Sequence, residues 1–159
     1  RPFESSTIES AASVTSNRSV DAPWILSTFW PTSLKISNTW LRIPRAVGSS
    51  TPRANLDFVT GAAGLEGLFD ASVTAEDVTL GKPDPLVFLK AAERIGRDPA
   101  RCVVFEDAHV GIEAGKRAGM KVVAVATTHP LKALGAADAA FENLAGLAVE
   151  TILAAVGLR

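Results

Sequence analysis

Residues 103–120 read VVFEDAHVGIEAGKRAGM, which predicts a strand, an acidic turn and a helix in succession. The apolar run at the start is short and rich in β-branched residues, which is typical of a parallel strand covered on both faces. Glu106 and Asp107 follow this strand directly, and Gly119 provides a stop signal for the helix. The apolar face of that helix would consist of Ile112, Ala114, Ala118 and Met120.

The two adjacent carboxylates, Glu106 and Asp107, come at the point where the strand ends. In an open sheet of parallel strands, ligands gather at the carboxyl ends of the strands. Paired carboxylates at that edge indicate a hard cation bound by oxygen, with Mg²⁺ as the best candidate. A simpler interpretation is a turn whose acids interact favourably with the positive end of the following helix. These residues alone leave both interpretations open.

Strand and helix signals alternate along the chain from Arg45 onward. After an expected strand at 46–48, a helix should begin at Pro52, with Thr51 as its N-cap, and end near Ala63. The other expected elements, besides the strand and helix above, are strands at 69–74, 121–126 and 138–141 and helices at 86–95 and 143–156. The first of these helices should turn Leu56, Val59 and Ala63 inward. Such alternation predicts right-handed βαβ units and therefore an α/β fold, a doubly wound, Rossmann-like parallel sheet in three α/β/α layers.

Residues 1–43 differ from the rest of the chain, which we take as one core domain at 44–159. They are rich in Ser and Thr, contain all three tryptophans and show no sustained period, which predicts a loop or a partly disordered leader. Within them only Trp24–Trp30, between two prolines, could form a strand. A Ser-rich leader can also be an organellar transit peptide, although the acids within this one argue against it. We therefore expect a cytoplasmic protein, with a plastid or another organelle as the alternative.

The bulk composition excludes several classes of protein. At 159 residues the chain is long enough for one α/β domain with its own core. Its net charge of −1 implies no nucleic-acid partner, and no apolar run approaches the roughly 20 residues of a membrane span. The single cysteine, Cys102, excludes an internal disulfide framework and should fill the core rather than act as a nucleophile. The oligomeric state stays unknown.

Polar residues follow several of the expected strands, and a parallel sheet would place all of them on one edge. They are Ser49, Thr74 with Lys82 beyond it, Glu106 with Asp107, and Thr127 with Thr128. Ser49 and the backbone N–H groups behind it could hold a phosphate, or the Ser-Ser-Thr run could simply cap a helix. Lys82, on a turn stiffened by two prolines, could neutralise phosphoryl charge or could be an ordinary surface lysine. Taken together, these residues form a set of parts for Mg²⁺-assisted phosphoryl transfer.

The two histidines are weaker candidates. His109 lies in the first turn of the helix after the acids and could be a general base, but a solvent-facing or capping role is commoner for such a residue. His129 precedes Pro130 and is expected in a loop. The sequence contains neither a glycine-rich phosphate loop of the Gly-x-x-x-x-Gly-Lys type nor a Cys/His metal spacing.

Three segments carry a resemblance to a known family, namely VGSSTPR at 47–53, GKPDP at 81–85 and VFEDAHVGI at 104–112. They closely resemble, in order and in spacing, the second, third and fourth motifs of the haloacid dehalogenase-like hydrolases. The nearest subgroup is the β-phosphoglucomutase-like sugar phosphatases and mutases. The resemblance covers the chain from about Arg45 to Leu158.

The resemblance implies a mechanism and a set of roles. In this family an aspartate of a first motif, Asp-x-Asp, attacks the phosphoryl group of a small phosphorylated metabolite, here a sugar or polyol phosphate, and forms an aspartyl phosphate. By position, Ser49 and Ser50 would bind the phosphate, and Lys82 would steady the charge of the nucleophile and the phosphate. Asp107 would ligate Mg²⁺ directly, and Glu106 would do so through water.

The first motif itself is absent from this sequence. No Asp-x-Asp precedes Ser49, and there is no room for the helical cap that the family places between its first and second motifs. The first-motif strand of the family lies between the second- and fourth-motif strands, and its loss would expose two strand edges. We hypothesise that Trp24–Trp30 takes its place. Because Ser27 and Thr28 are not carboxylates, the resemblance implies a phosphatase with weak activity or none.

Three accounts of this pattern stay open. The chain could be the carboxyl-terminal part of a family member behind an unrelated leader, as a splice variant or a faulty gene model would give. It could be a pseudoenzyme that binds Mg²⁺ and phosphate without turnover. It could also be a receiver-like regulatory domain that accepts a phosphate on an aspartate such as Asp107, although Ser49 and Lys82 would then need separate explanations.

Overall fold

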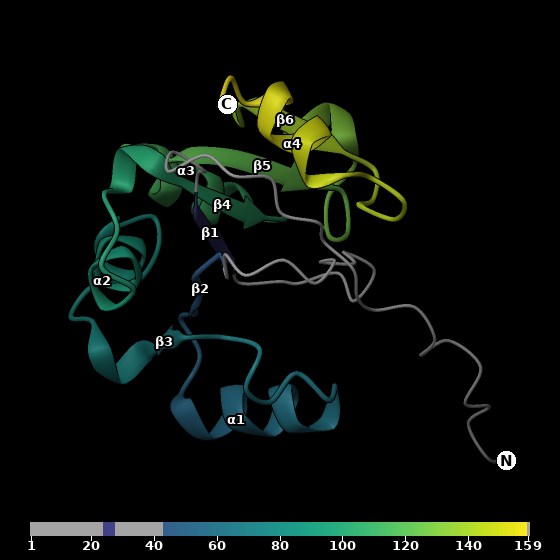
Figure 1. Ribbon diagram of the computed structural model, residues 1–159. Helices are drawn as coiled ribbons and strands as arrows, with labels where there is room; N and C mark the ends of the chain where they lie inside the picture. Colours follow the sequence, from purple (N-terminus) through teal and green to yellow (C-terminus); the bar gives the residue numbers. More distant parts are fainter. Residues whose placement is uncertain (1–23, 28–42, 159) are drawn as a thin grey trace, which may run out of the picture.

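A six-stranded parallel sheet organises the fold (Figure 1). The computed structural model describes residues 24–27 and 43–158. The strands are β1 (Trp24–Ser27), β2 (Arg45–Gly48), β3 (Ala71–Val73), β4 (Cys102–Glu106), β5 (Lys121–Val125) and β6 (Ala139–Phe141). Their order across the sheet is β3-β2-β1-β4-β5-β6, and the neighbouring strands are parallel throughout. The expected α/β fold with a doubly wound parallel sheet is therefore confirmed.

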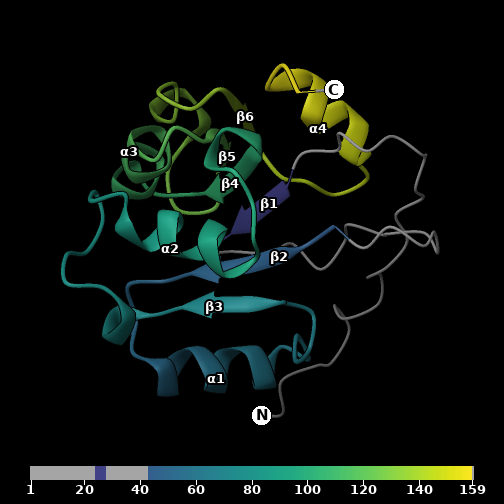
Figure 2. The ribbon, with the colours of Figure 1, turned by 60° about the vertical axis from the view of Figure 1, so that its left-hand side comes forward.

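Helices cover both faces of this sheet. They are α1 (Arg53–Ala62), α2 (Leu86–Arg94), α3 (His109–Arg117) and α4 (Val149–Ala155), with 3-10 turns η1 (Ala75–Asp77), η2 (Pro99–Arg101) and η3 (Leu131–Ala133). α2 and α3 lie on one face, whereas α1, beside β3, and α4, near the other end of the sheet, lie on the opposite face (Figure 2). From β2 the chain passes through α1 to β3, toward one edge of the sheet, and from β4 it passes through α3 to β5, toward the other edge. Because crossovers between parallel strands are right-handed, these opposite directions place α1 and α3 on opposite faces.

The core has one part on each face of the sheet. Alternate residues of β4 divide between the two parts: Val104 packs toward α2 and α3, whereas Val103 and Phe105 pack toward α4. Every residue of β4 is buried, Glu106 included, as expected for a strand covered on both faces. The apolar face predicted for the helix that follows is buried as well.

β1 lies in the middle of the sheet. It pairs with both β2 and β4, so that Leu26 is opposite Ala46 on one side and Val104 on the other. For Trp24–Ser27 this confirms the hypothesis that an amino-terminal segment takes the place between the second- and fourth-motif strands. Residues 28–30 of that expected strand, and residues 1–23 and 31–42 of the expected leader, lie outside the described residues.

The start of α1 differs from the prediction. The helix begins at Arg53 and its N-cap position is Pro52, because the backbone of Pro52 is extended, with a ψ of 149°. Thr51 therefore lies before the N-cap position, and its N–H donates to the hydroxyl of Ser49 at 3.2 Å. The N–H of Arg53 donates instead to the carboxylate of Glu76 at 3.0 Å, so a residue of η1, the turn after β3, caps the start of the helix.

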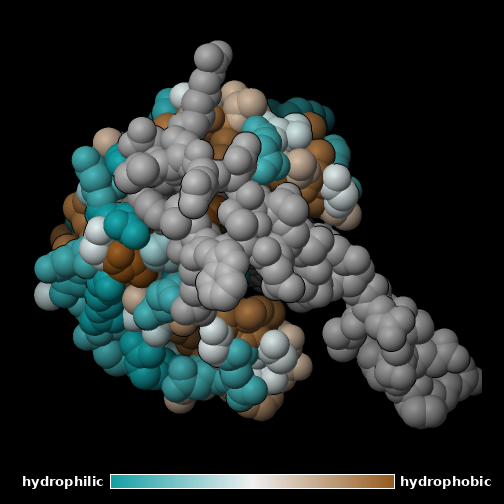
Figure 3. All heavy atoms as spheres, in the orientation of Figure 1, coloured by the Kyte–Doolittle hydropathy of each residue, from teal (hydrophilic) through white to brown (hydrophobic). Residues whose placement is uncertain are grey.

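The inward face predicted for α1 is only partly correct, because Leu56 lines the cavity beneath the helix whereas Val59 and Ala63 are exposed. No residue of α1 is buried, Val59 is 58% exposed, Ala63 is exposed and Leu56 is half-buried. The period of the sequence identifies an apolar stripe, but α1 stands off the sheet and a cavity lies beneath it. On the face of the molecule drawn in Figure 3, hydrophobic residues likewise lie in small groups among hydrophilic ones.

The last helix is shorter than predicted, because α4 covers only Val149–Ala155 of the expected 143–156. In the segment before it, the side chain of Asn143 accepts the N–H of Ala145 at 3.0 Å, and Gly146 has a φ of 74°. Both features favour a turn over a helix. In the part of the chain that the structure describes, no helix has the length and apolar character needed to cross a membrane.

Candidate functional site

Lys82 lies on the turn that leads into α2. The N–H of Asp84 donates to the carbonyl of Gly81 at 3.0 Å, and the Asp84 carboxylate accepts the N–H of Leu86 at 2.9 Å. The carbonyl of Pro83 accepts a hydrogen bond from Arg117 at the end of α3, at 3.4 Å. The turn is therefore tied to both helices on this face of the sheet, which fixes where the lysine side chain starts.

The ammonium group of Lys82 forms an ion pair with the carboxylate of Glu106 at the end of β4. The side chains are only 11% and 2% exposed, respectively. The Nζ atom of Lys82 also lies 4.8 Å from the ring centroid of Phe88, a distance at which the ring face attracts a cation. Because a buried ion pair becomes an unpaired buried charge when either partner is removed, each of these groups depends on the other.

Two glycines make room for this pair. A Cβ atom on Gly111, in the first turn of α3, would lie 2.1 Å from the carboxyl carbon of Glu106, so the helix backbone approaches the carboxylate as only glycine allows. A Cβ atom on Gly48, at the end of β2, would lie 3.2 Å from the ring of Phe88. The two glycines thus allow close packing around Glu106 and Phe88, the two residues that contact the Lys82 ammonium group.

Asp107, directly after the buried strand, is half-buried and faces the loop that follows β5. The hydroxyl of Thr127 donates to its Oδ2 atom at 3.0 Å, and the hydroxyl of Thr128 donates to the same oxygen. The sequence placed these threonines on the same edge of the sheet as the acids, but the contact itself could not be predicted. The only sequence signal for this contact was that two threonines follow β5, the strand that pairs with β4.

Ser49 and Ser50 follow β2 on the same edge of the sheet. The backbone N–H of Ser49 donates to the carbonyl of Val73 at 2.9 Å, its hydroxyl accepts from the N–H of Thr51, and Ser50 is exposed. Among the described residues, no hydrogen bond joins either serine to Lys82 or to the acids. Thr74, also expected on this edge, is buried and donates its hydroxyl to Asp77, away from the site.

The oxygen donors of this site suit Mg²⁺ better than a transition metal. Mg²⁺ is typically held by one or two carboxylates, several waters and the phosphate of a substrate, which is what Asp107 and Glu106 could complete. Within the ranges that the structure describes, no group of three or more His, Cys, Asp or Glu side chains is arranged to hold a metal on its own. The residues present therefore fit a cation that is shared with water and phosphate.

The histidines and the cysteine take positions consistent with minor roles. His109 begins α3 and is exposed, and its ring centroid lies 4.7 Å from that of His129 in the loop after β5. Cys102 is buried at the start of β4, as expected for a core residue. Burial raises the pKa of the Cys102 thiol to about 12, so it stays protonated and unreactive at neutral pH.

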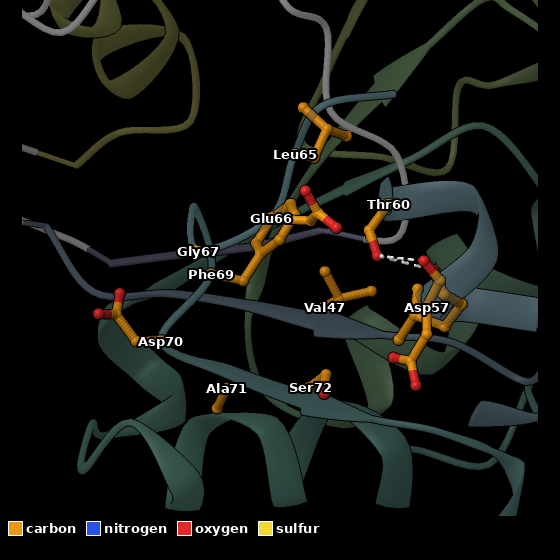
Figure 4. Close-up of a pocket in the computed structure, with 11 residues that line it drawn as sticks. Val47, Asp57, Thr60, Leu65, Glu66, Gly67, Phe69, Asp70, Ala71 and Ser72 are labelled. Atoms are coloured by element: carbon orange, nitrogen blue, oxygen red, sulfur yellow. Dashed lines mark hydrogen bonds between the residues drawn. The ribbon is translucent and has the colours of Figure 1, made fainter. Parts of the chain in front are cut away.

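A separate cavity of about 240 Å³ opens on the opposite face of the sheet, between α1 and the strands β2 and β3 (Figure 4). Among the described residues, its lining carries carboxylates from Asp57, Glu66 and Asp70, and no lysine or arginine. The hydroxyl of Thr60 donates to carbonyls of α1, at 2.9 and 3.1 Å, rather than toward a ligand. The charged residues in the described lining are all carboxylates, which makes this cavity a poorer candidate for a phosphate than the strand ends.

Comparisons with known proteins find a matching family model and several similar proteins. The family model of the haloacid dehalogenase-like hydrolases matches residues 23–119. The chloroplastic 5-amino-6-(5-phospho-D-ribitylamino)uracil phosphatase of Arabidopsis thaliana is 41% identical over 68% of this chain and 29% of its own. The fructose-1-phosphate phosphatase of Escherichia coli is 45% identical over 53% of this chain and 45% of its own.

A solved structure, the β-phosphoglucomutase of Clostridium difficile, superimposes on this chain with a TM-score of 0.64 and 26% identity, over 72% of this chain and 49% of that one. The chain spans less than half the length of each of these relatives, with shares of 29%, 45% and 49%.

Proposed function

We propose that this chain, which belongs to the haloacid dehalogenase-like hydrolase family, carries the phosphate- and Mg²⁺-binding half of a phosphatase site for small phosphorylated metabolites. The observation that carries the proposal is the buried ion pair of Lys82 and Glu106, with Asp107 beside it, at the carboxyl ends of parallel strands. A buried cation next to a carboxylate pair is an arrangement that binds a phosphate and a metal ion together.

Each residue has a role in this proposal. Asp107 would be the direct ligand of Mg²⁺, and Glu106 would contact the ion through water while its ion pair holds Lys82 in place. When bound, Mg²⁺ polarises the phosphoryl oxygens. Lys82 neutralises the negative charge of the phosphate, and Ser49 and Ser50 donate hydrogen bonds to its oxygens.

Sugar and polyol phosphates are the proposed ligand class. Two relatives are named as phosphatases of phosphorylated small molecules, one a ribityl compound and the other fructose 1-phosphate. The chain offers Lys82 and two serines as phosphate ligands, so the phosphoryl group is the part of the ligand that this half of the site recognises. A sugar-specific contact is not needed for the binding that we propose.

Turnover by this chain is proposed to be weak or absent. No Asp-x-Asp precedes Ser49, and β1, which lies between β2 and β4, ends at Ser27. A serine cannot form the aspartyl phosphate of the family mechanism. The chain would then act as a binding protein for Mg²⁺ and a phosphate ester, which is the pseudoenzyme alternative.

The test is Mg²⁺-dependent release of phosphate from an aryl phosphate and a panel of sugar phosphates, with Lys82→Ala and Asp107→Ala beside the unaltered chain. Asp57→Ala, an exposed residue on α1, is the matched control. We expect no release above background, together with a rise in Tm with Mg²⁺ that Asp107→Ala loses and Asp57→Ala keeps. Turnover abolished by both site variants would contradict the proposed inactivity, and a Tm indifferent to Mg²⁺ would contradict the metal site.

A further inference from the structure

We propose that Thr127 and Thr128 are positioning residues that orient the Asp107 carboxylate for a cation. The inference rests on the proposed Mg²⁺ site and adds to it the residues that set the direction of the ligand. Both hydroxyls donate to the same oxygen, Oδ2, with a Thr127 distance of 3.0 Å. No described residue donates a hydrogen bond to the other oxygen, Oδ1, which is thereby left for the metal.

The loop that carries the threonines is held by its backbone. The N–H of Thr127 donates to the carbonyl of Val125 at 2.8 Å, which closes a tight turn directly after β5. The N–H of Ala126 donates to the carbonyl of Phe141 in the edge strand β6 at 2.9 Å. The hydroxyls therefore start from a backbone fixed on two sides, although both threonine side chains are exposed.

A side-chain contact fastens the same loop to α3. The ring of His129, the residue after the threonines, lies 4.7 Å from the ring of His109, with the two ring planes tilted by 36°. His109 is the first residue of α3 and lies two residues after Asp107, so this contact holds the loop close to the acidic turn. The loop and the acidic turn are thus joined twice, once through the carboxylate and once through the rings.

The physical consequence concerns the freedom of the carboxylate. An aspartate at the end of a strand can rotate its side chain, and a metal that binds it must then fix that rotation at an entropic cost. Two donors on one oxygen restrict the rotation before the metal arrives. Hydrogen-bond partners of metal ligands typically contribute about 10- to 100-fold to metal affinity.

The experiment is a calorimetric titration of Mg²⁺ into the purified chain and into the double variant Thr127→Val with Thr128→Val, which removes both hydroxyls and keeps the shape of the side chains. We expect a Kd about tenfold weaker for the double variant. The Tm without metal should stay nearly unchanged, because the threonines are exposed. The double variant Thr127→Ser with Thr128→Ser should restore the affinity, and Thr151→Val on α4 serves as the remote control.

The outcomes separate this inference from the proposed function. An unchanged Kd in the double valine variant, while Asp107→Ala abolishes binding, would overturn the inference and leave the metal site standing. Absence of binding by the unaltered chain would overturn both. The single variants Thr127→Val and Thr128→Val are titrated as well, so that a double variant that fails to fold still leaves a decisive comparison.

Discussion

At the scale of single residues, the site depends on a glycine as much as on its charged groups. Gly111 lets the backbone of α3 approach the Glu106 carboxylate, which in turn holds Lys82. A methyl group at this position would overlap the carboxyl group, with its Cβ 2.1 Å from the Glu106 carboxyl carbon. Neither side can yield easily, because the carboxylate is buried and the helix is packed on the sheet.

We therefore expect Gly111→Ala to lower the free energy of unfolding by about 1–3 kcal/mol, from overpacking. The sign is informative, because helix propensity alone would make alanine more favourable than glycine by about 1 kcal/mol. Urea unfolding measures the effect. Gly135→Ala is the control, since a Cβ there meets no atom within 4 Å, and it should be nearly neutral. Equal stability of the two variants would contradict the described packing of Glu106.

At the scale of elements, Asp77 in η1 joins α1 to α2. Its carboxylate accepts hydrogen bonds from Arg94 at 2.6 Å, from Arg53 at 3.2 Å and from the N–H of Thr74 at 2.8 Å. The hydrogen bond from Arg94 is the main reason why the pKa of Asp77 lies well below its usual 3.8. This connection explains how α1 keeps its place although none of its own residues is buried.

The lowered pKa of Asp77 predicts a pH dependence. A carboxyl group with a lower pKa in the folded chain stabilises the fold above its unfolded pKa, and the contribution is lost as the pH falls further toward the folded value. We expect Asp77→Asn to cost about 1 kcal/mol at pH 7, a modest figure because solvent screens partly exposed pairs. The difference from the unaltered chain should shrink below pH 3.8.

Thermal unfolding at pH 7 and at about pH 2.5 measures both parts of this prediction. Asp57→Asn, at an exposed residue of α1, is the matched control and should show little change at either pH. A loss of stability by Asp77→Asn that is the same at both pH values would contradict the role given to this carboxylate.

At the scale of the whole molecule, β1 connects the two halves of the sheet. It pairs with β2 on one side and with β4 on the other, so the sheet would divide without it. A strand paired on both sides should open only when the fold unfolds globally. Hydrogen exchange followed by mass spectrometry should show the amides of residues 24–27 as protected as those of β4 and better protected than those of the edge strand β3. Exchange at the rate of an edge strand would contradict the central position of β1.

Much of this architecture could be predicted from local sequence. The strand and helix around the acids are confirmed because their apolar pattern and their glycine stop agree. The position of β1 was inferred from the family resemblance, because the first-motif strand of that family lies between the second- and fourth-motif strands. The exposed face of α1 and the short α4 could not be predicted, because periodicity identifies an apolar stripe and not the contacts that cover it.

The candidate site divides in the same way. Its location at the strand ends follows from topology, so the common edge of Lys82, Glu106 and Asp107 could be predicted. The roles of these residues came from the family resemblance and remain predictions. The contact of Thr127 and Thr128 with Asp107 joins segments that are 20 and 21 residues apart, and no local pattern encodes such a contact.

The most direct measurement is a calorimetric titration of Mg²⁺ into the unaltered chain, into Asp107→Ala and into Asp57→Ala. We expect binding by the unaltered chain and by Asp57→Ala, and loss of binding in Asp107→Ala while the variant keeps a cooperative melting transition. Absence of binding by the unaltered chain, or equal binding by Asp107→Ala, would contradict the claim that the ends of these strands form a metal and phosphate site.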